Sequence, residues 1–142
     1  MKNKIIFICT GNSCRSQIAE GLFRNEAGEK FKVYSAGSHP SRLHPAAIKV
    51  MAEWGIDIQK QKSEKIDKYL NERINVVITV CDNAKSTCPN FPDGNIIIHW
   101  SIKDPFHGWN DNEEDLEPYR MARNEIKEKI KDLLQRDEMK NL

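Results

Sequence analysis

The chain has 142 residues, and we expect residues 1–142 to form a single domain with its own core. Its 22 basic residues nearly balance its 21 acidic ones, which is not the basic excess of a nucleic-acid-binding protein. The apolar runs are too short for a membrane span or a signal peptide. We therefore expect a cytoplasmic monomer that binds neither nucleic acid nor a membrane.

Apolar runs alternate with amphipathic stretches along the chain. The apolar runs predict strands at residues 4–8, 31–35, 75–80 and 95–99, and their β-branched content suits a parallel sheet covered on both faces. Helical spacing predicts helices at 16–25, 44–54 and 117–136, a weaker helix near 65–73, and a frayed charged end at 137–142. The alternation predicts an α/β fold: an open four-stranded parallel sheet flanked by helices on both faces.

A short polar loop separates the first predicted strand from the first predicted helix. Cys9, five residues and then Arg15 is the spacing of a phosphate-binding loop with a thiolate at its centre. Backbone N–H groups of such a loop can surround a tetrahedral oxyanion, and the start of the following helix adds its positive end. We therefore predict that the oxyanion is bound by Thr10, Gly11, Asn12, Ser13, Cys14, Arg15 and Ser16.

The chemistry expected at this loop depends on one thiol and one guanidinium. Arg15 offers two parallel N–H groups to two oxygens of the anion. We expect the same positive field to lower the pKa of Cys9, which would make this thiol the nucleophile. The sequence thus predicts covalent attack by Cys9 on the central atom of a bound oxyanion.

Two further reactive residues follow strands of the predicted sheet. Cys81 comes directly after the third strand, and Asp104 comes a few residues after the fourth. Ligands of open parallel sheets bind beyond the carboxyl ends of the strands, so we expect both residues at the same edge as Cys9. An Asp before Pro105 is often only a turn residue. Beside an oxyanion loop, we predict that Asp104 is a general acid.

The four cysteines, Cys9, Cys14, Cys81 and Cys88, allow three interpretations. They could be buried structural thiols. A zinc site would need close pairs, whereas four residues separate the first pair and six the second. The third interpretation is a redox pair at Cys81 and Cys88. A helix over this segment would hold their Cα atoms about 10 Å apart, beyond the roughly 4.4–6.8 Å of a disulfide, so oxidation would unwind the segment.

Residues 8–16 resemble the low-molecular-weight protein-tyrosine-phosphatase superfamily. The second half of the chain is similar to the thioredoxin-coupled arsenate reductases built on that scaffold, through Thr79-Val80-Cys81-Asp82, Cys88-Pro89, His99-Trp100 and Asp104-Pro105. The resemblance covers nearly the whole chain. It implies a phosphatase-like fold with the anion loop between the first strand and the first helix, and a role in arsenic detoxification.

The resemblance also implies a relay of three thiols. Cys9 would attack arsenate while Asp104 protonates the departing oxygen. Cys81 would then attack the sulfur of Cys9 and release arsenite, and Cys88 would attack Cys81. Thioredoxin would reduce the final disulfide between Cys81 and Cys88. Phosphate and sulfate would compete with arsenate, and no tightly bound organic cofactor is implied.

Some members of this family hold a potassium ion near the anion loop. The matching positions are Asn12, Glu20, Ser35 and Glu64. Members that hold the ion commonly have Asp at the last of these positions, and Glu64 is one methylene longer.

The alternative function is a phosphatase acting on phosphotyrosine or small phosphate esters, which the reductase would retain as a residual activity. It would use Cys9, Arg15 and Asp104 but gives no role to Cys81 and Cys88. After Asp104-Pro105 the chain continues with Phe106-His107-Gly108, without the tyrosines typical of those phosphatases.

Overall fold

The computed structural model describes residues 2–91 and 96–142. Residue 95, which we predicted to begin the fourth strand, lies outside the described residues. The elements in chain order are β1 (Asn3–Cys9), α1 (Arg15–Ala27), β2 (Phe31–Gly37), α2 (Pro45–Ala52), the 3-10 helix η1 (Ile66–Tyr69), β3 (Val76–Thr79), α3 (Asp82–Thr87), β4 (Ile96–His99), the 3-10 helix η2 (Glu113–Asp115), α4 (Glu117–Gln135) and α5 (Asp137–Lys140).

The four strands form one parallel sheet, as predicted, and their order in the sheet is β2-β1-β3-β4. Ile8 of β1 pairs with Ala36 of β2 on one side and with Thr79 of β3 on the other. The chain leaves β1 toward β2 and later returns on the other side to form β3. The loops after β1 and β3 therefore start side by side, at the point where ligands bind in such sheets.

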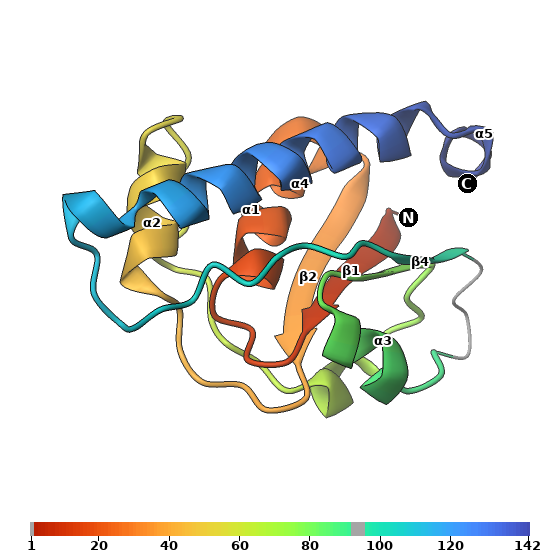
Figure 1. Cartoon of the computed structure of the whole chain (residues 1–142). Coiled ribbons are helices and arrows are strands. Elements are labelled where there is room, and N and C mark those ends of the chain that lie inside the picture. Colours follow the sequence, from red (N-terminus) through yellow and green to blue (C-terminus); the bar gives the residue numbers. More distant parts are fainter. Residues whose placement is uncertain (1, 92–95) are drawn as a thin grey trace.

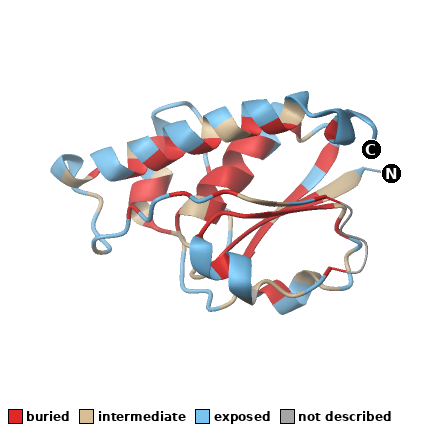
Figure 2. Ribbon diagram, turned by 45° about the vertical axis from the view of Figure 1, so that its right-hand side comes forward, coloured by how far each residue is buried: buried red, intermediate tan, exposed pale blue. Residues whose placement is uncertain are grey.

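Helices cover both faces of the sheet (Figure 1). α1 packs against β1, β2 and α4, and α2 packs against α4, whereas α3 contacts β1 and β3. The buried residues gather in the strands and on the sheet-facing sides of the helices (Figure 2). Apolar residues of β1 are buried from Ile5 to Ile8, because both faces of this central strand are covered. Within the described residues, no helix combines the length and apolar character needed to cross a bilayer.

Three segments differ from the sequence-based expectation. Residues 65–73 form only the short η1, because the stretch is largely charged and only Ile66 of η1 is buried. The polar segment after Cys81 does form a helix, α3. The C-terminal residues do not simply fray, because α5 buries Met139. The amphipathic helix α4 is confirmed, with its start at Glu117 as predicted.

Candidate functional site

The loop from Thr10 to Cys14 turns its carbonyl groups outward. The carbonyl of Thr10 accepts from the N–H of His39 at 2.9 Å, and that of Ser13 accepts from the N–H of His44 at 3.0 Å. Those of Gly11 and Asn12 are bound by Ser41, Ser63 and Gln17. A peptide's N–H points opposite to its carbonyl. The amides of residues 11–14 therefore converge on the inner side of the loop, as an anion-binding site requires.

The sulfur of Cys9 lies within this ring of amides. It accepts the N–H of Asn12 at 3.2 Å and lies 2.9 Å from the hydroxyl of Ser16. Asn12 has a φ of 45°, in the left-handed region that Asn tolerates better than most residues. The thiol is also close to the first turn of α1, whose exposed N–H groups favour negative charge.

Burial raises the pKa of the Cys9 thiol above its ordinary value. The hydrogen bond from Ser16 and the charge of Arg15 act in the opposite direction. The sequence-based expectation of a lowered pKa is therefore wrong in this structure, because the loop removes the sulfur from water. Burial also raises the pKa of Cys14, so this second thiol of the loop is protonated at neutral pH.

The side chain of Asn12 is completely buried and every polar atom of it is used. Its amide oxygen accepts the backbone N–H of Glu64 at 2.8 Å. This bond distinguishes the oxygen of the side-chain amide from its nitrogen. Its NH2 group then donates to two hydroxyls, that of Ser16 at 2.7 Å and that of Ser35 at 3.0 Å. The loop is thus tied to β2 and to the segment before η1.

These bonds set the direction of the hydroxyl proton beside the sulfur of Cys9. Because the hydroxyl oxygen of Ser16 accepts from Asn12, its own proton is available for the sulfur of Cys9. On the other side, Ser35 donates to the carboxylate of Glu20. A hydroxyl that donates to the sulfur stabilises the thiolate rather than the thiol.

Arg15 and Asp104 meet at the rim of the loop. A guanidinium nitrogen of Arg15 donates to the carbonyl of Ile102 at 2.9 Å, and the other lies 3.5 Å from the carboxylate of Asp104. Asp104 also accepts the N–H of Phe106 at 3.0 Å, and its side chain is more than half exposed. The structure thus brings Asp104 to the loop, where a carboxylic acid can reach an oxygen of a bound anion.

Cys81 lies beside the first residue of the loop. Its sulfur is 3.5 Å from the hydroxyl of Thr10, which also accepts from Asn83 at 2.9 Å. The same sulfur accepts the N–H of Ala84 at 3.4 Å and so caps the start of α3. The structure therefore places the thiol of Cys81 at the edge of the anion loop, in addition to Cys9 and Cys14 within it.

Cys88 lies at the far end of α3, where it ends the helix. It is half-buried, its sulfur donates to the carbonyl of Pro89 at 3.5 Å, and burial raises its pKa. The four cysteines are all free thiols. Since α3 separates Cys81 from Cys88, a bond between them requires this helix to unwind. Among the described residues, the Cys, His, Asp and Glu side chains form no group suited to a metal ion, so the zinc alternative has no support.

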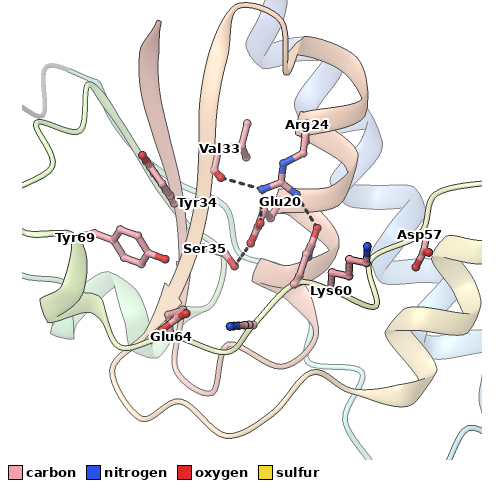
Figure 3. Close-up of a pocket in the computed structure, with 11 residues that line it drawn as sticks. Glu20, Arg24, Val33, Tyr34, Ser35, Asp57, Lys60, Glu64 and Tyr69 are labelled. Carbon is pink, nitrogen blue, oxygen red and sulfur yellow. Dashed lines mark hydrogen bonds and ion pairs between the residues drawn. The ribbon is translucent and has the colours of Figure 1, made fainter.

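Of the four residues matched to a potassium site, three lie together. Asn12, Ser35 and Glu20 form the hydrogen-bonded row described above, and Glu20 also binds Arg24. The carboxylate of Glu64 instead accepts from Lys68 at 3.1 Å, and only its backbone reaches Asn12. Glu20, Ser35 and Glu64 line a pocket of about 430 Å³ (Figure 3). The potassium ion itself stays a prediction.

Two residues of the site were missed from sequence. Gln17 is fully buried and donates from one amide to the carbonyls of Asn12 and Lys62. Gly37 ends β2 opposite Cys9, and a Cβ there would lie 2.4 Å from the carbonyl oxygen of Thr10. Two features of the sequence could have identified them. Gln17 is a polar residue on the apolar face of the first helix, and Gly37 is a glycine at the carboxyl end of a strand.

Comparisons with known proteins agree with this geometry. Residues 4–141 match the family described as low molecular weight phosphotyrosine protein phosphatase. A relative from Halalkalibacterium halodurans, named arsenate reductase, is 42% identical over 130 residues, which cover 92% of this chain and 94% of the relative.

Two solved structures are similar as well. One is described as an arsenate reductase in the phosphate binding state. It superposes with a TM-score of 0.75 at 36% identity and covers 94% of this chain and 97% of its own. The other is a thioredoxin-dependent arsenate reductase from Corynebacterium glutamicum, with a TM-score of 0.74 at 26% identity. That alignment covers 94% of this chain and 61% of the other.

Proposed function

The chain belongs to the low molecular weight phosphotyrosine protein phosphatase family, and we propose that within this family it is an arsenate reductase with a relay of three thiols and thioredoxin as the electron donor. The observation that carries the proposal is Cys81, a second thiol at the edge of the anion loop. An ester hydrolase has no use for it. Relatives named arsenate reductase, and a similar solved structure described as a thioredoxin-dependent arsenate reductase, support the same choice.

In the first step Cys9 attacks arsenate held by the inward amides of the loop. The thiolate forms a sulfur–arsenic bond, and an oxygen leaves arsenic as water after Asp104 supplies a proton. Arg15 and the amides balance the negative charge that builds up on the remaining oxygens. The hydroxyl of Ser16 stabilises the thiolate before attack, which offsets part of the effect of burial.

In the second step the thiolate of Cys81 attacks the sulfur of Cys9. The electron pair of the sulfur–arsenic bond moves to arsenic, which leaves as arsenite, reduced by two electrons. The two thiols are oxidised by the same two electrons to a disulfide between Cys9 and Cys81. The position of Cys81 beside Thr10 supports this order of attack.

In the third step Cys88 attacks Cys81 and returns Cys9 to the thiolate. This exchange requires α3 to unwind, since its two ends carry the reacting sulfurs. The dithiol of reduced thioredoxin then reduces the disulfide between Cys81 and Cys88 by the same exchange chemistry. Free thiols with this role persist in a reducing compartment, so we place the reaction in the cytoplasm.

The test is arsenate-dependent oxidation of NADPH in the presence of thioredoxin and thioredoxin reductase. A parallel assay replaces these with glutaredoxin, glutathione and glutathione reductase. We expect turnover with the thioredoxin system and little with the glutaredoxin system. Hydrolysis of a phenyl phosphate without arsenate-dependent oxidation would instead identify an ester hydrolase.

Two variants separate the relay from general damage to α3. Cys88→Ser should release about one arsenite per chain and then stop, with the disulfide between Cys9 and Cys81 accumulating in mass spectra. Ser86→Ala, in the same helix, keeps all thiols and should turn over. Normal turnover by Cys88→Ser would exclude the three-thiol relay.

A further inference from the structure

The residues matched to a potassium site do not fit a bound ion as they are arranged here. The amide oxygen of Asn12, the only side-chain atom with which it could hold a cation, accepts the N–H of Glu64. The carboxylate of Glu64 accepts from Lys68 instead. The hydroxyl of Ser35 is bonded on both sides, to Asn12 and to Glu20. The ligand atoms are therefore already engaged within the chain.

The guanidinium of Arg24 lies where a cation would be expected. It donates to the carboxylate of Glu20, to the carbonyl of Val33 at 3.0 Å and to the side-chain oxygen of Gln61 at 3.0 Å. Carboxylate, backbone carbonyl and amide oxygens are the ligands that hard metal cations prefer. Figure 3 shows Glu20 of α1 and the carbonyl of Val33 in β2 converging on Arg24. Gln61 reaches the same guanidinium from the segment before η1.

We propose that Arg24 is the resident cation of this site, and that it takes the place of a bound monovalent metal ion beside Glu20. The guanidinium reaches Glu20 from one turn further along α1, so the pair is formed within a single helix. A metal ion placed at the same oxygens would meet a fixed positive charge.

The charge around the pocket supports this assignment. Three carboxylates and three cations line it, so no net negative charge remains to attract a further ion: Glu20, Asp57 and Glu64 against Arg24, Lys60 and Lys62. The side chain of Glu20 is nearly buried, which makes an unpaired charge at this position costly. Arg24 therefore neutralises the one carboxylate of the group that water reaches least.

Arg24 is connected to the anion loop by a row of hydrogen bonds. Arg24 holds Glu20, Glu20 accepts from Ser35, and Ser35 accepts from Asn12. Loss of the guanidinium should therefore loosen the row that ends at the loop, unless another cation replaces it.

The experiment compares thermal unfolding in potassium chloride and in choline chloride at equal ionic strength. Choline is the reference cation because the methyl groups on its quaternary nitrogen prevent oxygen atoms from coordinating the charge directly. We expect the same melting temperature for the wild-type chain in both salts. Arg24→Met should melt about 5 °C lower in choline chloride, and potassium should restore part of that loss because the carboxylate of Glu20 then binds the ion.

Three further variants sharpen the comparison. Arg24→Lys keeps a positive charge and should show no difference between the salts. The double variant Glu20→Gln/Arg24→Met lacks the carboxylate and should lose the recovery in potassium. Lys32→Met removes an exposed cation of β2 and is the control for surface charge.

Several outcomes would overturn the proposal. They are stabilisation of the wild-type chain by potassium over choline, equal melting of Arg24→Met and wild type in choline, or no effect of potassium on Arg24→Met. The readout is unfolding and not arsenate chemistry, so a failure here leaves the proposed function untouched, and the reverse also holds.

Discussion

Ser16 donates its hydroxyl proton toward the sulfur of Cys9 across 2.9 Å, because Asn12 already occupies the hydroxyl oxygen of Ser16. The direction of this bond follows from the amide of Asn12, which the backbone of Glu64 fixes from behind. This hydrogen bond favours the thiolate form of Cys9, against the effect of burial, and its direction is set by Asn12 and the backbone of Glu64.

Ser16→Ala should make Cys9 ionise at higher pH. Burial raises the pKa of Cys9 and the Ser16 hydroxyl lowers it, so removing the hydroxyl leaves burial less opposed. The pH profile of Cys9 alkylation by iodoacetamide, followed by mass spectrometry, should shift to higher pH. Ser38→Ala, whose hydroxyl pairs with His39 at 3.0 Å, is the control and should leave the profile in place. An unshifted Ser16→Ala profile would mean that the hydroxyl donates elsewhere.

Asp104→Asn should slow turnover about 100-fold without weakening anion binding. The carboxyl group lies 3.5 Å from Arg15, so its removal takes away a proton donor while leaving the guanidinium and the loop amides in place. The measurements are kcat for arsenate and the inhibition constant for phosphate. Asp111, like Asp104, follows β4, and it forms an exposed ion pair with Lys49. Asp111→Asn removes that pair and should keep kcat near wild type. Equal rates for Asp104→Asn and wild type would show that the residue only shapes the turn.

Gly37→Ala should damage the anion loop from the outside. The added Cβ would lie 2.4 Å from the carbonyl oxygen of Thr10 and 3.0 Å from the amide nitrogen of Asn12, and both are backbone atoms that cannot rotate away. We expect a loss of about 2 kcal/mol of stability and weaker phosphate binding, measured by urea unfolding and calorimetry. Gly11→Ala meets its nearest atoms only at 3.7 and 3.8 Å and should unfold closer to wild type.

Glu53 should contribute to stability only above acidic pH. Arg120 and then Arg123 lower its pKa to about 2, against burial, which acts to raise it. The depressed pKa means that this stability is present above the unfolded pKa of about 4.3 and is lost as pH falls toward 2. Because the side chain is about one-third exposed, we expect about 1 kcal/mol at pH 7.

Urea unfolding of Glu53→Gln and wild type at pH 7 and pH 3 measures this contribution. The difference in the free energy of unfolding should shrink at pH 3, where wild type also begins to lose the charge. Glu26→Gln, an exposed glutamate of α1, should differ from wild type at neither pH. If the difference in the free energy of unfolding between Glu53→Gln and wild type is the same at pH 7 and pH 3, the charge of Glu53 does not stabilise the packing of α2 against α4.

The sequence was sufficient to predict the sheet and the position of the loop. Near-continuous apolar runs identify strands, and the spacing of Cys9 and Arg15 between a strand and a helix identifies the loop. Both signals are local, so they survive without knowledge of the packing. The confirmed parallel order then places Cys81 and Asp104 at the same edge.

The remaining features depend on contacts between distant segments. The raised pKa of Cys9 follows from burial by the whole chain, which no local pattern reports. The residues of α3 have weak helical propensity, and the helix begins with a sulfur cap from Cys81 and contacts from Asp82 to His99 and Ser101, which a local pattern does not report. Gln17 reaches Lys62, forty-five positions away, and Arg24 reaches Val33 in another element besides its neighbour Glu20 in α1, so these contacts emerge only with the fold.

The thiol of Cys81 has two roles, since it reacts in the proposed relay and also caps the start of α3. The sulfur of Cys81 caps the helix that keeps Cys88 at a distance. Once that sulfur bonds to another atom, it is a poorer acceptor for the amide of Ala84, and the first turn of α3 keeps only its other contacts, such as those of Asp82 with His99 and Ser101. In the proposed relay, oxidation of Cys81 thus weakens the cap of the helix that must unwind before Cys88 can attack. The second exchange therefore prepares the third.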